Sequence, residues 1–209
     1  EGENPVTAVK EAGVLPKVRA KVDHHNAMPW RDVPAFYAEL EERSANAAKA
    51  LQFTIVTACR TSEVLGMTWD EVDVDARLWT IPAARMKGGA QHRIPLTDEM
   101  LRILKPMKAL ASTYVFEGQK RHRPLSNMSM LMLLRRMGRG QFTVHGFRST
   151  FRDWAGEAGA PREVAEAALA HRVGSDVERA YARSDLLERR RALMVAWGKM
   201  LAPAVSEGE

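Results

Sequence analysis

A single cysteine, Cys59, is present in this sequence of 209 residues. One thiol cannot form an internal disulfide, and it excludes any CxxC metal site. Such cysteine usage is typical of a reducing compartment, so we expect a cytoplasmic location. No stretch approaches the ~18 consecutive apolar residues of a membrane-spanning helix, and no basic segment followed by an apolar one opens the chain. We therefore expect neither a membrane span nor a signal peptide.

The chain also lacks an initial methionine and begins at Glu1. Residues 1–29 hold three prolines and show no sustained hydrophobic period, which predicts a linker or arm. We expect the sequence to be a fragment of a longer protein. The compact part is predicted to span residues 30–201, enough for one domain with a sizeable core. Residues 202–209 should form a frayed, flexible tail.

Acidic residues are absent from one long stretch. Overall, 31 Lys and Arg exceed 26 Asp and Glu by five, which is a moderate excess. Between Gln119 and Arg152 there is no Asp or Glu, but there are eight basic residues: Lys120, Arg121, Arg123, Arg135, Arg136, Arg139, Arg148 and Arg152. Solvated faces normally intersperse both signs, so this stretch favours a polyanionic partner. A merely solvated basic face is the alternative.

Hydrophobic periodicity predicts a mostly α chain with one small antiparallel β-sheet. Helices are expected at 32–44, 45–59, from Thr97 as N-cap to about 107, and at 126–137, 144–158, 161–169, 175–182 and 185–200. The strands are expected within 68–82 and 92–96, where β-branched and aromatic residues cluster, with a glycine-containing connection between them. Residues 114–117 are a short strand at best.

Two stripes run along the predicted helix that contains HGFRSTFRDW. The apolar stripe recurs at i, i+4 and i+7 and consists of Phe147, Phe151 and Trp154. The polar stripe consists of His145, Arg148 and Arg152. The two should face nearly opposite ways, with the aromatic rings in the core and the polar stripe presented beside the most basic part of the chain. An isolated His-x-x-Arg pattern is more often structural than functional.

His171 follows the alanine-rich segment VAEAALA, and Tyr181 is one of only three tyrosines. Each residue alone is weak evidence for a function, and a tyrosine such as Tyr181 is more often a buried aromatic. Together with Arg148 they suit a phosphodiester substrate. A tyrosine hydroxyl can attack phosphorus and form a covalent intermediate. Arginines can clamp the phosphate oxygens, and histidines can bind the phosphate and move protons.

This scheme needs a second arginine and a proton donor for the leaving oxygen. Arg60 is the candidate arginine, with the carboxylate of Glu63 three residues later to orient it. Lys87, beside two glycines, is the candidate donor, and His92 is the next. In isolation, Arg60 and Glu63 would be a surface ion pair, and Lys87 a solvated side chain.

Four segments occur in the order, and at roughly the separations, found in one enzyme family: TACRTSEVLGMTWDEVD, MKGGAQHRIPLT, HGFRSTFRDWA and LAHRVGSDVERAYARSD. Over residues 30–200 the chain resembles the catalytic domain of the tyrosine recombinases, the phage integrase family. Within that family it is most similar to integrases of prophages and genomic islands. The resemblance implies the mostly α recombinase catalytic-domain fold for residues 30–201. It also implies that residues 1–29 are the linker left from missing amino-terminal DNA-binding domains.

The resemblance assigns roles residue by residue. The implied catalytic residues are Arg60, Lys87, His145, Arg148, His171 and Tyr181, with Glu63 supporting Arg60. Tyr181 would be the nucleophile, Arg60 and Arg148 the phosphate-binding arginines, and Lys87 the acid for the leaving oxygen. Further candidates for binding DNA phosphates are Arg121, Arg123, Arg135, Arg136, Arg139 and Arg152. Two positions depart from the family, where Cys59 and Ala170 stand in place of a frequent glycine.

The implied activity is site-specific recombination that integrates or excises a mobile element through a 3′-phosphotyrosyl intermediate. It implies no nucleotide cofactor, and no metal, because cationic side chains neutralise the phosphate. The implied partners are double-stranded attachment sites, further copies in a tetrameric synapse, and DNA-bending accessory proteins at the nucleoid of a bacterial host. A type IB topoisomerase-like activity and a non-catalytic DNA-binding regulator are the alternatives. The last helix has two alternatives, packing on its own domain or on a neighbouring protomer.

Overall fold

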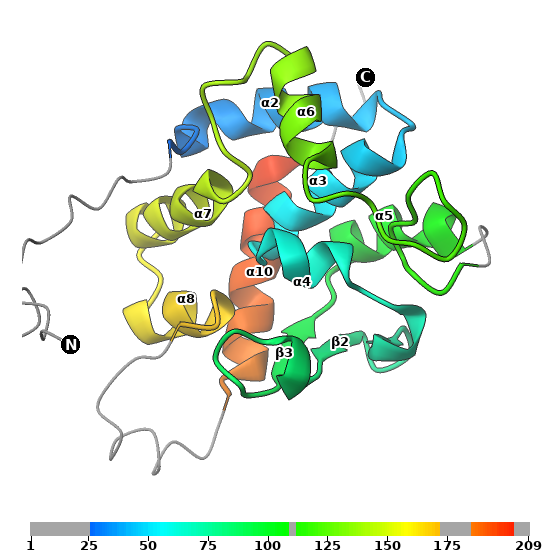
Figure 1. Cartoon of the computed structure of the whole chain (residues 1–209). Coiled ribbons are helices and arrows are strands. Elements are labelled where there is room, and N and C mark those ends of the chain that lie inside the picture. Colours follow the sequence, from blue (N-terminus) through cyan, green and yellow to red (C-terminus); the bar gives the residue numbers. More distant parts are fainter. Residues whose placement is uncertain (1–25, 109–111, 172–184, 203–209) are drawn as a thin grey trace, which may run out of the picture.

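The computed structural model describes residues 26–108, 112–171 and 185–202, and Figure 1 shows their arrangement. The predicted helix 175–182, which contains Tyr181, lies outside these residues. The helices are α2 (Val33–Glu41), α3 (Asn46–Thr57), α4 (Thr61–Leu65), α5 (Asp98–Lys108), α6 (Ser129–Arg136), α7 (Gly146–Glu157), α8 (Arg162–Ala168) and α10 (Leu187–Leu201). Short 3-10 helices are η1 (Trp30–Asp32), η2 (Trp69–Glu71) and η3 (Ala83–Arg85).

One antiparallel sheet accompanies the helices, in the order β1 (Val72–Asp73), β2 (Leu78–Ile81), β3 (His92–Pro95). The predicted fold class is therefore confirmed. Each helix predicted within the described residues is found, and Thr97 accepts a hydrogen bond from the amide of Met100 (3.4 Å), as its predicted N-cap role requires. Helix α4 was not predicted. Residues 114–117 contribute only isolated bridges, such as Thr68 with Tyr114.

Helix α3 is the centre of the core. Nine of its 12 residues are buried, and α2, α4, α5, α6, α7 and α10 all contact it. Burial on nearly every side requires partners for the polar side chains of this helix. Its buried threonines bond within the helix, for example Thr54 Oγ1 to the carbonyl of Ala50 (2.7 Å). Trp79 of β2 packs on Phe53 with ring centroids 5.6 Å apart, which attaches the sheet to α3.

Helix α10 packs on its own domain. It contacts α2, α3, α7, α8 and β3, and it lies behind α3 and α4 in Figure 1. Trp197 is fully buried, packs edge-on against Phe151 (5.5 Å) and donates from Nε1 to the carbonyl of Ile55 (2.9 Å). For residues 187–201, the structure therefore supports the first of the two alternatives.

The packed region begins before Trp30. Met28 is buried, and its carbonyl accepts a hydrogen bond from Thr150 Oγ1 of α7 (2.7 Å). Asn26 passes so close to α7 that a Cβ at Gly146 would lie 2.3 Å from its carbonyl oxygen. Only glycine permits this approach. The predicted domain boundaries stay predictions, but the residues just before Trp30 already pack against the domain.

Candidate active site

Arg148 of α7 lies inside the protein, with only 4% of its surface exposed. Its Nη1 donates to the carbonyl of Ala58 (2.5 Å) and its Nη2 to that of Leu169 (2.7 Å). These residues are the C-caps of α3 and α8, where unpaired carbonyls and the helix dipole favour a cation. The guanidinium therefore ties two helix ends together. The prediction that Arg148 faces away from the core was wrong, because these carbonyls supply partners inside the protein.

The surroundings of Arg148 destabilise its positive charge. Burial lowers the pKa of its guanidinium, and the nearby positive charge of Arg60 lowers that pKa further. An arginine nevertheless stays protonated in a protein. Two cations held near each other, one of them poorly solvated, are stabilised by an anion placed between them. The arrangement therefore favours an anionic ligand.

Arg60 is the N-cap of α4 and is fixed by Glu63. The buried Glu63 carboxylate accepts the Arg60 backbone N–H through Oε2 (2.8 Å) and its Nη1 through Oε1 (2.7 Å). The expected Arg60–Glu63 ion pair is confirmed. The Arg60 side chain remains 23% exposed. One carboxylate thus sets both the start of the helix and the direction of the arginine.

Left-handed residues precede two of the predicted site residues. Ala58 (φ 52°) ends α3 two residues before Arg60, and Ala170 (φ 50°) follows α8 immediately before His171. This conformation is the one that glycine adopts most readily. It explains why a glycine would suit the position of Ala170. In the first segment the residue with this conformation is Ala58, not Cys59.

His171 touches both Arg148 and a residue that the sequence analysis missed. Its Nε2 lies 3.0 Å from Arg148 Nη2, and its Nδ1 lies 2.6 Å from Oε2 of Glu166. Glu166 is buried on α8, and its Oε1 pairs with Arg152 Nη2 (2.8 Å). Glu166 is one of two acidic residues in the short α8, so only its spacing of five residues before His171 could have signalled it.

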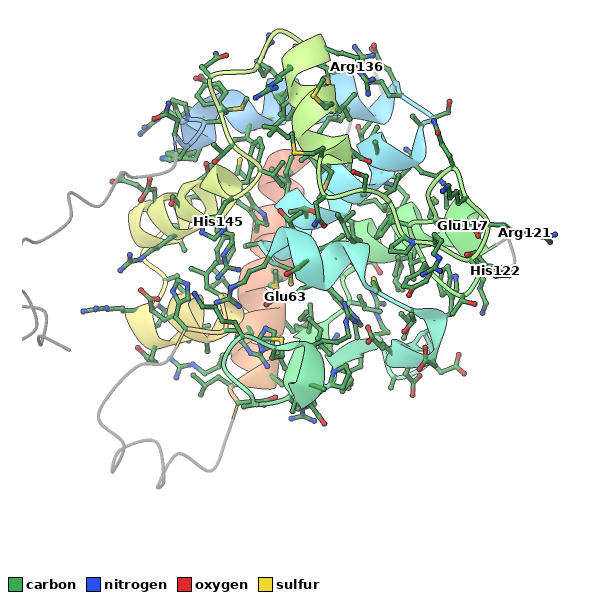
Figure 2. All side chains as sticks on the ribbon, in the orientation of Figure 1. Glu63, Glu117, Arg121, His122, Arg136 and His145 are labelled. Atoms are coloured by element: carbon green, nitrogen blue, oxygen red, sulfur yellow. The ribbon has the colours of Figure 1, made fainter. Side chains whose placement is uncertain are left out.

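Two further predicted catalytic residues, His145 and Lys87, lie on the surface of the described part of the chain. His145 is the exposed N-cap of α7, and Figure 2 shows it on the same side of the molecule as Glu63. Lys87 is exposed in the turn after η3. The start of this turn is anchored by Arg85, a second residue that the sequence analysis missed. Arg85 donates to the carbonyl of Glu63 and pairs with Glu71, which holds the loop of Lys87 against α4.

The phosphate-binding candidates are spread over a wide surface. Figure 2 shows Arg136 and Arg121 at the periphery, far from each other and from Glu63. Arg123 and Arg135 are also exposed. Arg139 pairs with Glu39 (2.9 Å), and Arg152 pairs with Glu166. Carboxylates from outside the stretch 119–152 therefore balance part of the positive charge that the sequence places there.

His92 is a poor proton donor in this structure. It is buried on β3, and burial together with the charge of Arg190 lowers its pKa to about 4. The imidazole is therefore neutral near pH 7. Among the described residues, no group of three or more His, Cys, Asp or Glu is placed to hold a metal ion. No helix in the described ranges is both long and apolar enough to span a membrane.

Comparisons with known proteins agree with this fold and site. The model of the Phage integrase family matches residues 27–187. The prophage integrase IntA of Escherichia coli (strain K12) is 40% identical over 156 residues, covering 73% of this chain and 38% of that protein. The integrase of Shigella phage Sf6 is 31% identical over 184 residues, covering 83% of this chain and 47% of that protein.

Solved structures show the same fold. Lambda integrase, as a dimer bound to a COC′ core site, superposes with a TM-score of 0.62 at 17% identity, covering 80% of this chain and 67% of that chain. A lambda integrase tetramer bound to a Holliday junction gives a TM-score of 0.62 at 17% identity, covering 82% of this chain and 56% of that chain.

A family model thus matches most of the length of this chain, which forms a mostly α domain with a buried guanidinium at an anion-favouring site. The chain belongs to the phage integrase family, the tyrosine recombinases. It spans less than half the length of these prophage and phage relatives. The matches do not favour the topoisomerase-like or the non-catalytic alternative.

Proposed function

We propose that this chain is the catalytic part of an integrase that cleaves and rejoins double-stranded DNA at attachment sites. The observation that carries the proposal is the convergence of Arg60, Arg148 and His171 on one partly exposed, cationic site. Two fixed guanidiniums can donate hydrogen bonds to a phosphate and stabilise the charge that develops in the transition state.

Tyr181 is the proposed nucleophile. Its hydroxyl attacks the phosphorus and gives up its proton to a histidine of the site, a 3′-phosphotyrosyl bond forms, and the 5′-oxygen leaves with a proton from Lys87. A 5′-hydroxyl of another strand then reverses these steps, so the bond energy is conserved without a nucleotide cofactor. Of the three tyrosines, Tyr37 is unsuited, because it is fully buried, it donates to Glu99, and burial raises its pKa. Tyr114 is the remaining competitor.

Self-association on DNA is part of the proposal. Lambda integrase forms a dimer on a core site and a tetramer on a Holliday junction, and we propose that the longer protein containing this chain assembles in the same way. Accessory DNA-bending proteins and a place at the nucleoid stay predictions.

The decisive experiment traps the covalent intermediate. A nicked suicide duplex is incubated with the chain, and a denaturant-resistant protein–DNA adduct is measured. Tyr181→Phe should bind DNA but form no adduct, and Arg148→Ala should slow adduct formation by about 10²- to 10³-fold, as expected on losing one preorganised donor. The exposed Arg43 provides a matched control, since Arg43→Ala removes the same charge outside the site. An adduct that persists in Tyr181→Phe and maps to Tyr114 would refute the assignment.

A further inference from the structure

We infer that Glu166 is a positioning residue that fixes the tautomer and orientation of His171, an inference that rests on the proposed function for its catalytic consequence. Glu166 lies on α8, is 6% exposed, and uses both carboxylate oxygens. A buried carboxylate is costly unless it is paired. Here its partners are His171 and Arg152, so the carboxylate supports the site as well as the fold.

The hydrogen bonds determine which nitrogen of His171 carries a proton. A carboxylate only accepts, so the contact of 2.6 Å requires a proton on Nδ1. A guanidinium only donates, so the contact of 3.0 Å between Arg148 Nη2 and Nε2 requires an unprotonated Nε2. These two contacts therefore place the ring proton of His171 on Nδ1 and leave Nε2 as an acceptor.

The ring is also held in place from its backbone. The amide of His171 donates to the carbonyl of Glu166 (2.9 Å), so the main chain and the side chain of one residue fix the imidazole. With Nδ1 committed to Glu166, Nε2 is directed at the guanidinium of Arg148. Nε2 is then a lone-pair acceptor beside the phosphate-binding Arg148, placed to take up a proton at the site. A carboxylate that orients a functional histidine in this way is a common arrangement in metal and catalytic sites.

Because Glu166 also binds Arg152, it needs two acceptor oxygens, which a neutral glutamine does not have. Nη2 of Arg152 lies 2.8 Å from Oε1, so the two oxygens of Glu166 serve two donors. A glutamine in this place has one oxygen and one NH2 group. The cationic Arg152 should claim the oxygen, which turns the NH2 group toward Nδ1 of His171. Nδ1 must then accept, the ring proton moves to Nε2, and Nε2–H faces the N–H donor of Arg148.

A spectroscopic test of this inference does not depend on activity. The ¹⁵N shifts of the His171 ring, assigned by comparison with His171→Ala, should show a proton on Nδ1 in the wild-type chain at pH 8 and on Nε2 in Glu166→Gln. In the double variant Arg152→Ala/Glu166→Gln the glutamine oxygen is free, and the proton should return to Nδ1. An identical tautomer in all three proteins would overturn the inference.

A kinetic test separates positioning from general support of the fold. Glu166→Gln should slow adduct formation on the suicide duplex by about 10- to 100-fold, the usual effect of losing a partner that orients a functional histidine. In a His171→Ala background the same change should have less than a ~2-fold effect, because residues that act through one another are not additive.

Glu163 offers a matched control on the same helix. It is exposed and pairs with Arg189 (3.2 Å), so Glu163→Gln removes the same charge without touching His171 and should keep the wild-type rate. If Glu166→Gln slows adduct formation by the same about 10- to 100-fold in the His171→Ala background, Glu166 has only a structural role. If the wild-type chain forms no adduct, the proposed function fails, whereas the ring-nitrogen measurement still decides the role of Glu166.

Discussion

Replacing Ala170 by glycine should stabilise the protein, which is unusual for a change that removes a side-chain carbon. Ala170 has φ 50°, a left-handed conformation that costs an alanine about 1–2 kcal/mol. Glycine avoids this cost but loses about 0.5–1 kcal/mol through the greater freedom of the unfolded chain. Because the methyl group of Ala170 is only partly buried, its loss subtracts less than ~0.8 kcal/mol. The expected net gain for Ala170→Gly is about 0.5 kcal/mol.

Two further alanines serve as references for this change. Ala58 has nearly the same φ, 52°, but its methyl group is fully buried, so Ala58→Gly should change stability by about 0 kcal/mol. Ala168 is buried within α8, where glycine loses both helix propensity and a packed methyl group, about 2 kcal/mol in total. The expected order of stability is Ala170→Gly, then Ala58→Gly, then Ala168→Gly.

Denaturant unfolding followed by circular dichroism measures these differences directly. For a chain of this length about 0.5 kcal/mol corresponds to a rise of about 1–2 °C in melting temperature. A loss of stability in Ala170→Gly as large as that in Ala168→Gly would refute the reasoning, because the left-handed turn would then not be a source of strain. The turn would still place His171, whose backbone bond to Glu166 does not involve the methyl group.

Four other outcomes are expected. The folded-state pKa of His92 is about 4, below the unfolded value of 6.5. The neutral His92 therefore contributes its full stability above pH 6.5, and this contribution is lost as the pH falls toward 4. Urea unfolding should show a loss of about 3 kcal/mol relative to His92→Leu. Cys59 is buried and burial raises its pKa to about 12, so it should resist iodoacetamide at pH 8 until the protein is unfolded. If Arg136 contacts a DNA phosphate, Arg136→Ala should reduce the slope of log K against log salt by about 0.9, measured by fluorescence anisotropy; an unchanged slope would remove it from the interface. Adduct formation should persist in excess EDTA, since side-chain cations neutralise the phosphate, and a strict requirement for magnesium would contradict the mechanism.

Local patterns in the sequence predicted most of the helices and the sheet. The aromatic stripe of α7 is buried as expected, with Phe147, Phe151 and Trp154 all in the core, because a period of 3.6 residues directly encodes one face. The Arg60–Glu63 pair was also predictable, since its partners are three residues apart on the chain. Such features depend on neighbours in sequence.

The burial of Arg148 and the role of Glu166 were not predictable in this way. The partners of Arg148 are backbone carbonyls 90 and 21 residues away, at the ends of two helices. Arginine is rarely buried without a carboxylate partner, so its side-chain type favoured the surface. Arg85 was missed for a related reason, because it binds a backbone carbonyl of Glu63, and backbone groups leave no trace in the residue pattern.

The described site residues are held by helix ends as well as by one another. Arg60 begins α4, His145 begins α7, Arg148 joins the ends of α3 and α8, and His171 follows the turn after α8. Side chains fixed at buried helix ends need little rearrangement to meet a charged ligand, and such preorganisation is what makes fixed donors effective in a transition state. The affinity of this site for phosphate should therefore depend on the packing of α7 against α3 and α8 as much as on the charges themselves. A cavity made in the core between these helices would then weaken catalysis without altering any residue that contacts DNA.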